Sequence, residues 1–453
     1  MRTAPPDLPG RNASSDSPLD RALALLLAGE REAALRWSAA VLKRDPSISS
    51  ALILTCRLLA DLGRTEAAIE GFGIGVRRAI DAGNLPLAVA AVGDLRLLGV
   101  NVDKYMDEIA DAFCADSPRL GDGVGAPPPP LPSALEFEPL SSFLTGPALL
   151  SKATEIIHDA AKEYESLSDS EPPLVSRLAL FSALSKGGLR ALIGCFEMIT
   201  IPAGDAVIKE GEEGAEAYIV ARGELEVQRE SEEDGVVRLA RLANGALFGE
   251  MALLSRAPRA ASVVALRPSI VLVARRDALE KVAEKNPDVG IELAAHCRRR
   301  MVANLVRTSA ALLAVDPTER PALVERFETK VFEKGEKLIE EGKQTTGLHL
   351  VASGEVAVVG HEEGGEPFVI ATLGVGETVG EVALVLRRVA NADVVAVHPT
   401  VTLHLPREDF TDLIRSHPAI LATLYLAAVA RDEETSTVLA GSTTALADDY
   451  ILV

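Results

Sequence analysis

The stretch from Phe248 to Val263 combines residue types that could bind a phosphorylated ligand. Its pattern predicts a short helix that begins at Gly249, a proline turn and a strand. Gly249 has no Cβ, so a ligand can approach the backbone, and the N–H groups at the helix start favour an anion. Arg259 supplies a charged planar fork that matches phosphate oxygens, while the Glu250 carboxylate accepts hydrogen bonds from hydroxyls. A phosphate site beside a carboxylate predicts a nucleotide ligand.

This stretch resembles the phosphate-binding cassette of the cyclic nucleotide-binding domain family, found in regulatory subunits of the cAMP-dependent kinase and in the catabolite activator protein. The resemblance implies that Glu250 holds the ribose 2′-hydroxyl and that Arg259 holds the cyclic phosphate. Backbone N–H groups of Gly249, Ala252 and Ala261 would complete the cage. The alternative is a Pro-Arg surface loop after an ordinary helix. The candidate binding residues are Phe248, Gly249, Glu250, Met251, Ala252, Leu253, Pro258, Arg259, Ala260, Ala261 and Ser262.

The resemblance also indicates which nucleotide to expect. In family members that prefer cGMP, the residue after the cassette arginine is often threonine, whose hydroxyl can meet the guanine amino group. That residue here is Ala260, and Ser262 would lie near the base. We therefore expect cAMP as the ligand, with cGMP as the alternative, and we expect no separate cofactor and no metal.

The 453-residue chain is long enough for two to four domains, each with its own core. Its net charge of −20 argues against a nucleic-acid partner, which requires clustered basic residues. Four scattered cysteines without metal-ligand spacing indicate a reduced, cytoplasmic protein. We expect no membrane insertion, because no apolar run reaches about 18 residues and the start lacks a signal-peptide pattern. Residues 1–18 are rich in Pro, Ser, Asp and Asn, which predicts disorder.

Residues 19–120 show a helical pattern with an internal period. Gly29 and Gly63 are 34 positions apart, as are Ala34 and Ala68. This spacing resembles the tetratricopeptide repeat, in which glycine serves the turn and alanine lets paired helices approach closely. Most of the large aromatic positions of that repeat are missing. The repeat predicts an unidentified protein partner on its concave face, and the alternative is a helical prop for the next domain.

Residues 121–134 form a Gly/Pro-rich segment that we interpret as a linker separating the helical repeat from everything downstream. Residues 135–172 are predicted to be a connecting helical segment, with a helix over about 146–166 that leads into the next domain. The run Gly71–Gly75 resembles part of a dinucleotide-binding fingerprint. It follows a helical pattern and lacks the full motif, so we reject that interpretation.

Residues 173–311 are predicted to open with a helical stretch over 174–184 and then to form short strands separated by glycines, as in a β-roll. The same glycines recur 131 positions later: Gly204 matches Gly335, and Gly249 matches Gly380. The chain is therefore expected to be an α+β multidomain protein. An N-terminal α-helical repeat precedes two tandem jelly-roll-like cyclic nucleotide-binding domains with flanking helices, the second over residues 312–432.

The second copy departs from the family pattern at the phosphate-binding position. The offset places Ala390 where the first copy has Arg259, and Asp393 adds a carboxylate nearby. Arg387 or Arg388 is an alternative source of positive charge. The preferred interpretation is a degenerate domain that packs, dimerises or relays a signal, so homodimerisation is compatible with the sequence.

A helix is predicted from Val289 to Leu313, between the two copies. Ile291, Leu293, Ala294, Met301 and Leu305 form a candidate apolar stripe. In the family a helix at this place closes over the bound nucleotide, and the alternative is a static connector. His296 and Arg298–Arg300 are interpreted as solvated residues, and residues 433–453 as a tail that frays or docks onto a partner.

The sequence favours a non-enzymatic receptor, because it carries no catalytic constellation and no kinase or cyclase signature. Cyclic nucleotide would enter the first pocket and change the contacts of the chain with a protein partner. The alternative is a scaffold in which both β-domains are structural. Glu250 and Arg259 discriminate the two, since a scaffold does not need a buried arginine that faces a carboxylate.

Overall fold

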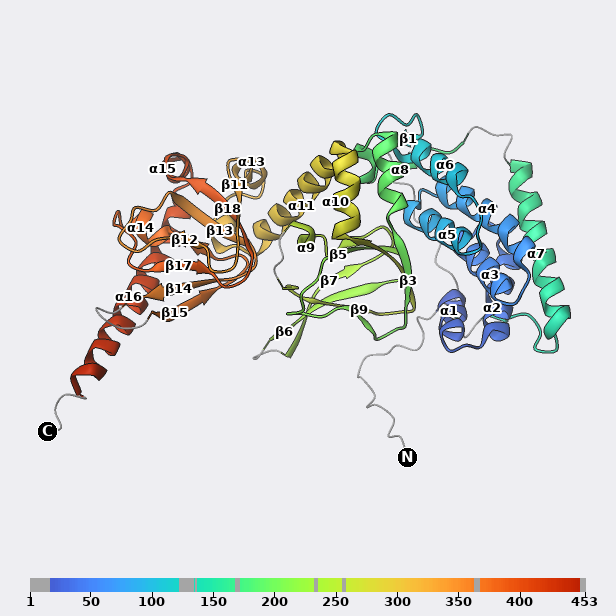
Figure 1. Ribbon diagram of the computed structural model, residues 1–453, viewed down its shortest axis with the longest axis horizontal. Coiled ribbons are helices and arrows are strands. Elements are labelled where there is room, and N and C mark those ends of the chain that lie inside the picture. The colour runs from blue at the N-terminus through green and yellow to red at the C-terminus, as the bar shows by residue number, and fades with distance from the viewer. Residues whose placement is uncertain are drawn as a thin grey trace. The chain divides into compact units, whose positions relative to one another are not determined.

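The computed structural model describes residues 17–121, 134, 137–167, 172–231, 235–254, 258–361 and 367–448 (Figure 1). Of the predicted disorder over residues 1–18, residues 1–16 lie outside this part, while Ser17 caps a helix that begins at Pro18. Most of the predicted linker and the last five residues also lie outside it. The chain divides into two compact units, described separately below. The first unit contains residues 1–209, 216–248 and 261–293, and the second contains residues 210–215, 249–260 and 294–453.

The first unit begins with an array of six helices, which confirms the predicted helical repeat. Gly29 and Gly63 lie in the turns inside successive helix pairs, after the first helix of each, with φ values of 81° and 86°, a conformation that glycine adopts without strain. Ala34 and Ala68 are fully buried, so the paired helices approach closely. The helices are α1 (Pro18–Leu27), α2 (Arg31–Arg44), α3 (Ser49–Asp61), α4 (Thr65–Asp81), α5 (Leu85–Leu97) and α6 (Asp103–Phe113).

The glycine run in α4 serves helix packing. A Cβ at Gly71 would lie 2.4 Å from Sγ of Cys56, and one at Gly73 would lie 2.6 Å from the hydroxyl of Tyr105. Both positions therefore require glycine, because neighbouring side chains fill the space that a larger residue would need. The run lies inside a helix, as the sequence interpretation expected.

The helical array packs on the first β-barrel, so the expectation that a linker separates them is wrong. Helix α7 (Gly146–Leu167) packs back on α2, α3 and α4 rather than leading into the next domain (Figure 1). Helix α5 packs on strands of the barrel. The carboxylate of Asp20 accepts a hydrogen bond from Nη2 of Arg222 at 2.7 Å, and both residues are buried.

The first barrel consists of two four-stranded antiparallel sheets, ordered β3-β10-β5-β8 and β4-β9-β6-β7. Apolar side chains from both sheets, among them Val220, Leu225 and Val271, fill the space between them. The strands are β3 (Glu197–Ile201), β4 (Ala206–Ile208), β5 (Glu216–Arg222), β6 (Leu225–Ser231), β7 (Gly235–Leu242), β8 (Leu247–Phe248), β9 (Ser262–Ala265) and β10 (Ser269–Arg275).

The predicted helical stretch over 174–184 is wrong. Pro172 and Pro173 favour extended backbone, and the short strand β2 (Val175–Ser176) pairs in parallel with β1 (Leu120–Gly121). Only a 3-10 turn over Phe181–Ala183 follows. The helix itself is α8 (Lys186–Gly194), which Ser185 caps by accepting a hydrogen bond from the N–H of Gly188.

The second unit contains a second barrel with the same topology, ordered β11-β18-β13-β16 and β12-β17-β14-β15. The segments that build it are β11 (Glu328–Phe332), β12 (Lys337–Ile339), β13 (Gly347–Ser353), β14 (Val356–Gly360), β15 (Phe368–Leu373), β16 (Thr378–Val379), α14 (Glu381–Val385), β17 (Asp393–Ala396) and β18 (Thr400–Pro406).

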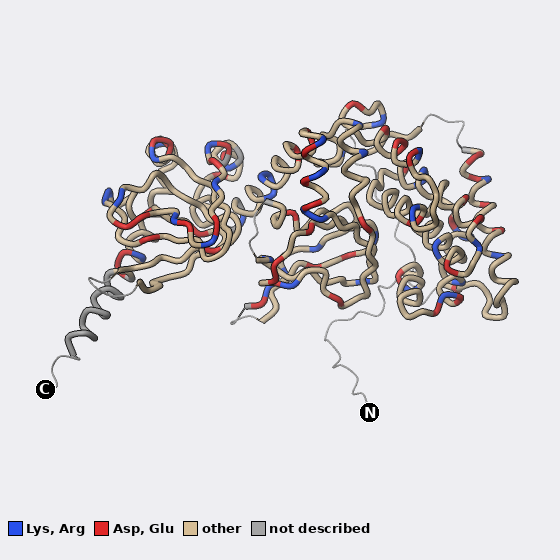
Figure 2. The backbone as a smooth tube through the Cα atoms, in the orientation of Figure 1, with Lys and Arg blue, Asp and Glu red and all other residues tan. Residues whose placement is uncertain are grey.

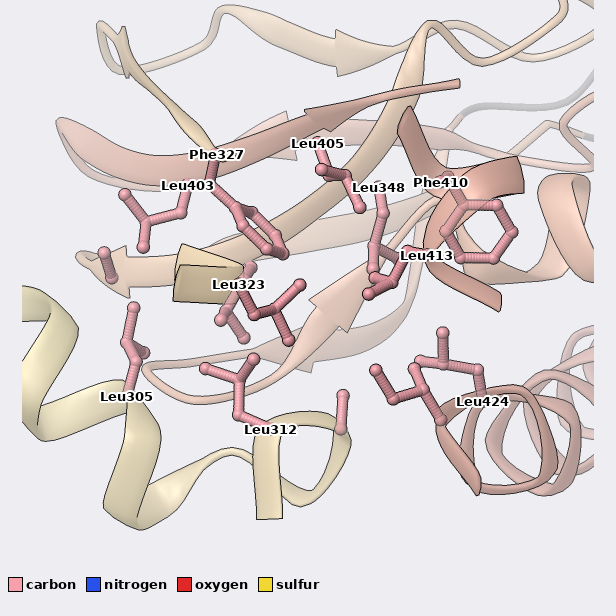
Figure 3. Close-up of a cluster of buried hydrophobic side chains, with 14 of the residues drawn as sticks. Leu305, Leu312, Leu323, Phe327, Leu348, Leu403, Leu405, Phe410, Leu413 and Leu424 are labelled. Carbon is pink, nitrogen blue, oxygen red and sulfur yellow. The ribbon is translucent and has the colours of Figure 1, made fainter. Parts of the chain in front are cut away.

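Helices cover one sheet of the second barrel and complete its core (Figure 3). Leu403 and Leu405 of β18 meet Leu312 of α12, Phe410 of α15 and Leu424 of α16 in one apolar cluster. The helices are α12 (Ala310–Leu313), α13 (Arg320–Val324), α15 (Arg407–Ser416) and α16 (Pro418–Asp448). The predicted boundary at residue 432 falls inside α16.

In the chain segment that connects the two barrels, α10 (Arg276–Lys285) and α11 (Pro287–Thr308) follow β10. The predicted apolar stripe is only partly right, since Met301 and Leu305 are buried but Ile291 is 66% exposed. Cys297 takes the buried place instead, four positions before Met301. Acidic and basic residues are interspersed along α10 (Figure 2).

Among the described residues, no single helix is both long and apolar enough to cross a bilayer. Helix α15 and the Pro418–Glu433 part of α16 reach that length and apolar character only when taken together, and they are bent by 117°.

Candidate functional site

The cassette begins where β8 ends. The ring of Phe248 stacks on that of Tyr218 with 5.2 Å between centroids, and Phe248 is buried. Gly249 follows with a φ of 72°, which turns the chain out of the strand. Helix α9 (Met251–Leu254) comes next and β9 begins at Ser262, so the predicted helix start and the predicted strand are confirmed.

Arg259 is held against the cassette rather than exposed to water. The residue is 9% exposed, and its Nη1 donates a hydrogen bond to the carbonyl oxygen of Gly249 at 2.9 Å. Its guanidinium lies over Gly214, where a Cβ would come within 2.3 Å of Nη2. Its backbone is fixed too, because its carbonyl accepts from the N–H of Gly211 and its own N–H donates to Glu212. A buried cation of fixed direction is suited to an anionic ligand.

Glu250 is the second buried charge of the cassette. It is 3% exposed, and Nε of Arg300 in α11 donates to its Oε1 at 3.1 Å. The thiol of Cys297, one turn earlier on α11, donates to the backbone carbonyl of Glu250 at 3.7 Å. Burial, followed by the charge of Glu250, raises the pKa of Cys297 to about 12, so the thiol stays protonated at neutral pH.

The sequence interpretation missed Arg300. We expected Arg298–Arg300 to be solvated, but Arg298 donates to the carbonyl oxygen of Phe327 and Arg300 pairs with Glu250. Both ring nitrogens of His296 are buried, and neither has a hydrogen-bond partner among the described residues.

The remaining cassette residues differ in their surroundings. Ala252 is buried, Met251 packs against the apolar core of the second unit, and Ala260 is exposed. Leu253 and Pro258 are half-buried and lie with Met251 and Arg259 in the second unit. Phe248, Ala261 and Ser262 belong to the first unit, where Ser262 begins β9. Their roles as ligand contacts remain predictions.

The second barrel repeats this cassette with its arginine removed. The N–H of Gly342 donates to the carbonyl of Ala390, and Ala390 donates to Lys343, which are the same bonds that fix Arg259. Ala390 therefore occupies the backbone position of Arg259. Thr345 stands 131 positions after Gly214, so the space that the Arg259 guanidinium needs is filled by a side chain in this copy.

The alternative cations do not replace the lost arginine. The guanidinium of Arg388 pairs with Asp432 of α16 and is half exposed. Arg387 lies on the turn with a φ of 52°, and neither arginine lines the cavity of the second barrel. Asp393 is buried, accepts from the N–H of Glu341 and pairs with Lys337. Burial alone would raise the pKa of Asp393, but these hydrogen bonds and the lysine charge hold it below its usual value.

Two jelly-roll-like barrels, each with a glycine-glutamate helix start, define a protein with tandem ligand-binding domains. The protein-family model named cyclic nucleotide-binding domain matches residues 198–286 and 329–417, two ranges related by the same 131-residue offset. A cAMP-dependent protein kinase regulatory subunit of Yarrowia lipolytica is 30% identical over 272 residues, which cover 60% of this chain and 67% of that protein. The chain belongs to the cyclic nucleotide-binding domain family.

Other relatives share smaller parts of their length. A cGMP-dependent protein kinase 2 of Mus musculus is 27% identical over 54% of this chain, which spans 31% of the kinase. Among solved structures, the regulatory domain of Toxoplasma gondii PKA with cAMP is 25% identical, covers 56% of this chain and 92% of its own, and has a TM-score of 0.27.

Proposed function

We propose that this chain is a non-enzymatic receptor for cyclic nucleotide, with one functional binding site in its first cassette and cAMP as its ligand. The observation that carries the proposal is the buried Arg259 guanidinium, held by the carbonyl of Gly249 directly before the buried Glu250. A cation beside a carboxylate suits a molecule that carries both a phosphate and hydroxyl groups. The Yarrowia lipolytica relative, described as a cAMP-dependent protein kinase regulatory subunit, supports the same ligand.

Helix α11 is the element through which we propose that binding is transmitted. Cys297 and Arg300 contact Glu250, while Met301 and Leu305 of the same helix lie in the core of the second unit. A ligand hydroxyl that donates to Glu250 competes with Arg300 for the carboxylate. A shift of Arg300 would move α11 and with it the buried side chains of Met301 and Leu305. The receptor would thereby change its contacts with a protein partner.

The helical array is the proposed surface for that partner. It is packed on the first barrel through the buried pair Asp20–Arg222, so a partner bound to the array contacts the same compact unit as the barrel. Affinity capture with the full chain, with and without cAMP, tests this step. A partner whose capture does not depend on cAMP would favour the scaffold over the receptor.

A calorimetric titration of the full chain with cAMP tests the proposed ligand directly. We expect one molecule of cAMP per chain. Two sites per chain would show that the second barrel also binds cyclic phosphate, and no binding up to millimolar cAMP would overturn the receptor.

A further inference from the structure

The helical array of the first unit contains a cavity of about 820 Å³. Residues of α4, α6 and α7 line it, together with Pro118 shortly before β1 and Pro173 shortly before β2. Helix α4 contacts both α6 and α7 (Figure 1). Much of the lining is apolar, including Ile80, Ala112 and the ring of Tyr164. A cavity of this volume and lining is of the kind that binds small organic molecules.

A buried guanidinium, that of Arg78, is part of the lining. Arg78 is 6% exposed, and its Nη2 donates a hydrogen bond to the carbonyl oxygen of Ala160 at 2.8 Å. Its Nη1 donates to the carbonyl oxygen of Pro46, and its Cζ lies 5.4 Å from the centroid of the Tyr164 ring. These contacts hold the guanidinium in one direction.

The charge of Arg78 is left without a counterion among the described residues. Arg78 forms no ion pair with another described residue, and its Nε is buried without a hydrogen-bond partner there. Burial lowers the pKa of Arg78, and the charge of Glu163 offsets only part of this effect. Because a buried charge is stabilised by a counterion and by hydrogen bonds, an anion that accepts from Nε would be bound favourably.

The other charges of the cavity limit which anion fits. Arg77 pairs with Glu108 at 3.2 Å, and Arg119 pairs with Asp81 at 2.8 Å. Four of the described lining residues are carboxylates and three are arginines, so their formal charge is −1. A phosphate dianion would meet more repulsion here than a carboxylate, which brings a single negative charge to Arg78.

We propose that this cavity binds an apolar molecule with a single carboxylate, the chemical class of the aromatic and aliphatic monocarboxylic acids. The carboxylate accepts a hydrogen bond from Nε of Arg78, and the apolar body packs on Ile80, Ala112 and the Tyr164 ring. This inference goes beyond the receptor proposed above, because it assigns a second ligand to a cavity whose lining includes no cassette residue.

The test is a calorimetric titration of the full chain with naphthylacetate, naphthylacetamide and naphthyl phosphate. We expect one naphthylacetate per chain. The amide should bind about 10-fold more weakly or worse, because it brings no charge to Arg78. The phosphate should also bind more weakly, because it adds a second negative charge. Equal affinity for acid and amide, or tighter binding of the phosphate, would overturn the proposal.

Arg78→Gln should weaken naphthylacetate binding about 10-fold or more, because the glutamine amide carries no charge. Arg64→Gln changes an exposed arginine directly before α4 and outside the cavity. It is the matched control and should leave the affinity unchanged. Equal losses in the two variants would contradict the assignment to Arg78.

A second substitution keeps the test valid if Arg78→Gln unfolds the array. Glu163 lines the cavity, is exposed and acts on the charge of Arg78, so Glu163→Gln should strengthen naphthylacetate binding about threefold. Glu165→Gln, an exposed change on α7 outside the cavity, serves as the comparison. No gain in Glu163→Gln, or the same gain in Glu165→Gln, would count against the proposed site.

The outcome can be separated from that of the receptor proposal. Arg259→Ala protein should bind naphthylacetate with unchanged affinity even though it no longer binds cAMP. Displacement of naphthylacetate by cAMP would place it in a cassette and overturn the inference. Absence of naphthylacetate binding at millimolar concentration, in a chain that still binds cAMP, would overturn the inference and leave the receptor standing.

Discussion

Arg300 and Arg431 are 131 positions apart, the offset that relates the two barrels, and each pairs with the glutamate of a cassette. Arg300 binds Glu250 and Arg431 binds Glu381, in both cases from a helix that follows the barrel. The two copies therefore share the link between carboxylate and helix. They differ in the cation that would receive a phosphate, which is present as Arg259 and absent at Ala390.

Arg300→Gln should leave cAMP bound but remove the ion pair between α11 and the Glu250 carboxylate. The glutamine keeps a polar end without the charge that pairs with Glu250. We expect cAMP to increase the hydrogen-exchange protection of residues 294–308 in the unchanged chain and not in this variant. Arg299→Gln, an exposed neighbour on the same helix, is the control. An undiminished cAMP response in Arg300→Gln would rule out this route.

Arg259→Ala should reduce cAMP affinity about 100-fold or more. The guanidinium is buried and its loss removes charge-assisted hydrogen bonds, each worth about 1.5–3 kcal/mol. Arg388→Ala should change the affinity by less than about twofold, because Arg388 pairs with Asp432 on a half-exposed surface. Calorimetry of both variants gives the comparison, and equal losses would mean that the second site binds the cyclic phosphate.

Ala260→Thr should raise the affinity for cGMP relative to cAMP. The exposed Ala260 follows Arg259 and offers no hydroxyl to a guanine amino group. One added hydrogen bond is worth about 1 kcal/mol, so we expect a shift of roughly fivefold in the ratio of affinities. Competition titrations with both nucleotides measure it. Tighter binding of cGMP than of cAMP by the unchanged chain would contradict the expected preference.

The second barrel should lose stability as the pH falls below about 6.5, the usual histidine pKa. Burial, followed by the charge of His404, lowers the pKa of His349 to about 3, and burial with Lys330 lowers that of His404. The unfolded chain therefore binds protons that the folded barrel does not, so stability is full above the unfolded pKa and declines towards pH 3.

We expect the free energy of unfolding of the second barrel, measured in urea, to fall by roughly 2 kcal/mol between pH 7 and pH 5. His349→Gln removes the main titrating group and should flatten this dependence. His398→Gln, on the turn before β18 and outside the His349–His404 contact, serves as the comparison. The same slope in His349→Gln as in the unchanged chain would assign the pH dependence to other groups.

Arg222→Met should destabilise the first unit by about 3 kcal/mol, since it leaves the buried Asp20 carboxylate without its close partner. Arg267, whose Nη1 lies 3.6 Å from Asp20, offsets part of this loss. Thermal unfolding measures the effect. Arg238→Met, which removes a 70% exposed side chain paired with Glu226, should change stability by less than about 0.5 kcal/mol. Equal losses of stability in the Arg222→Met and Arg238→Met variants would show that the Asp20–Arg222 pair does not hold the helical array and the barrel together.

Local signals in the sequence determined the helices, the strands and the cassette. Gly204, Gly249 and their copies 131 positions later mark turns with positive φ, and that requirement is readable from residue type alone. The missing arginine at Ala390 was equally visible. Tertiary structure alone decided that Arg300 binds Glu250, that α7 returns to the helical array, and that Arg431 binds Glu381. Each depends on residues about fifty or more positions apart meeting in space, and neither periodicity nor propensity reports such contacts.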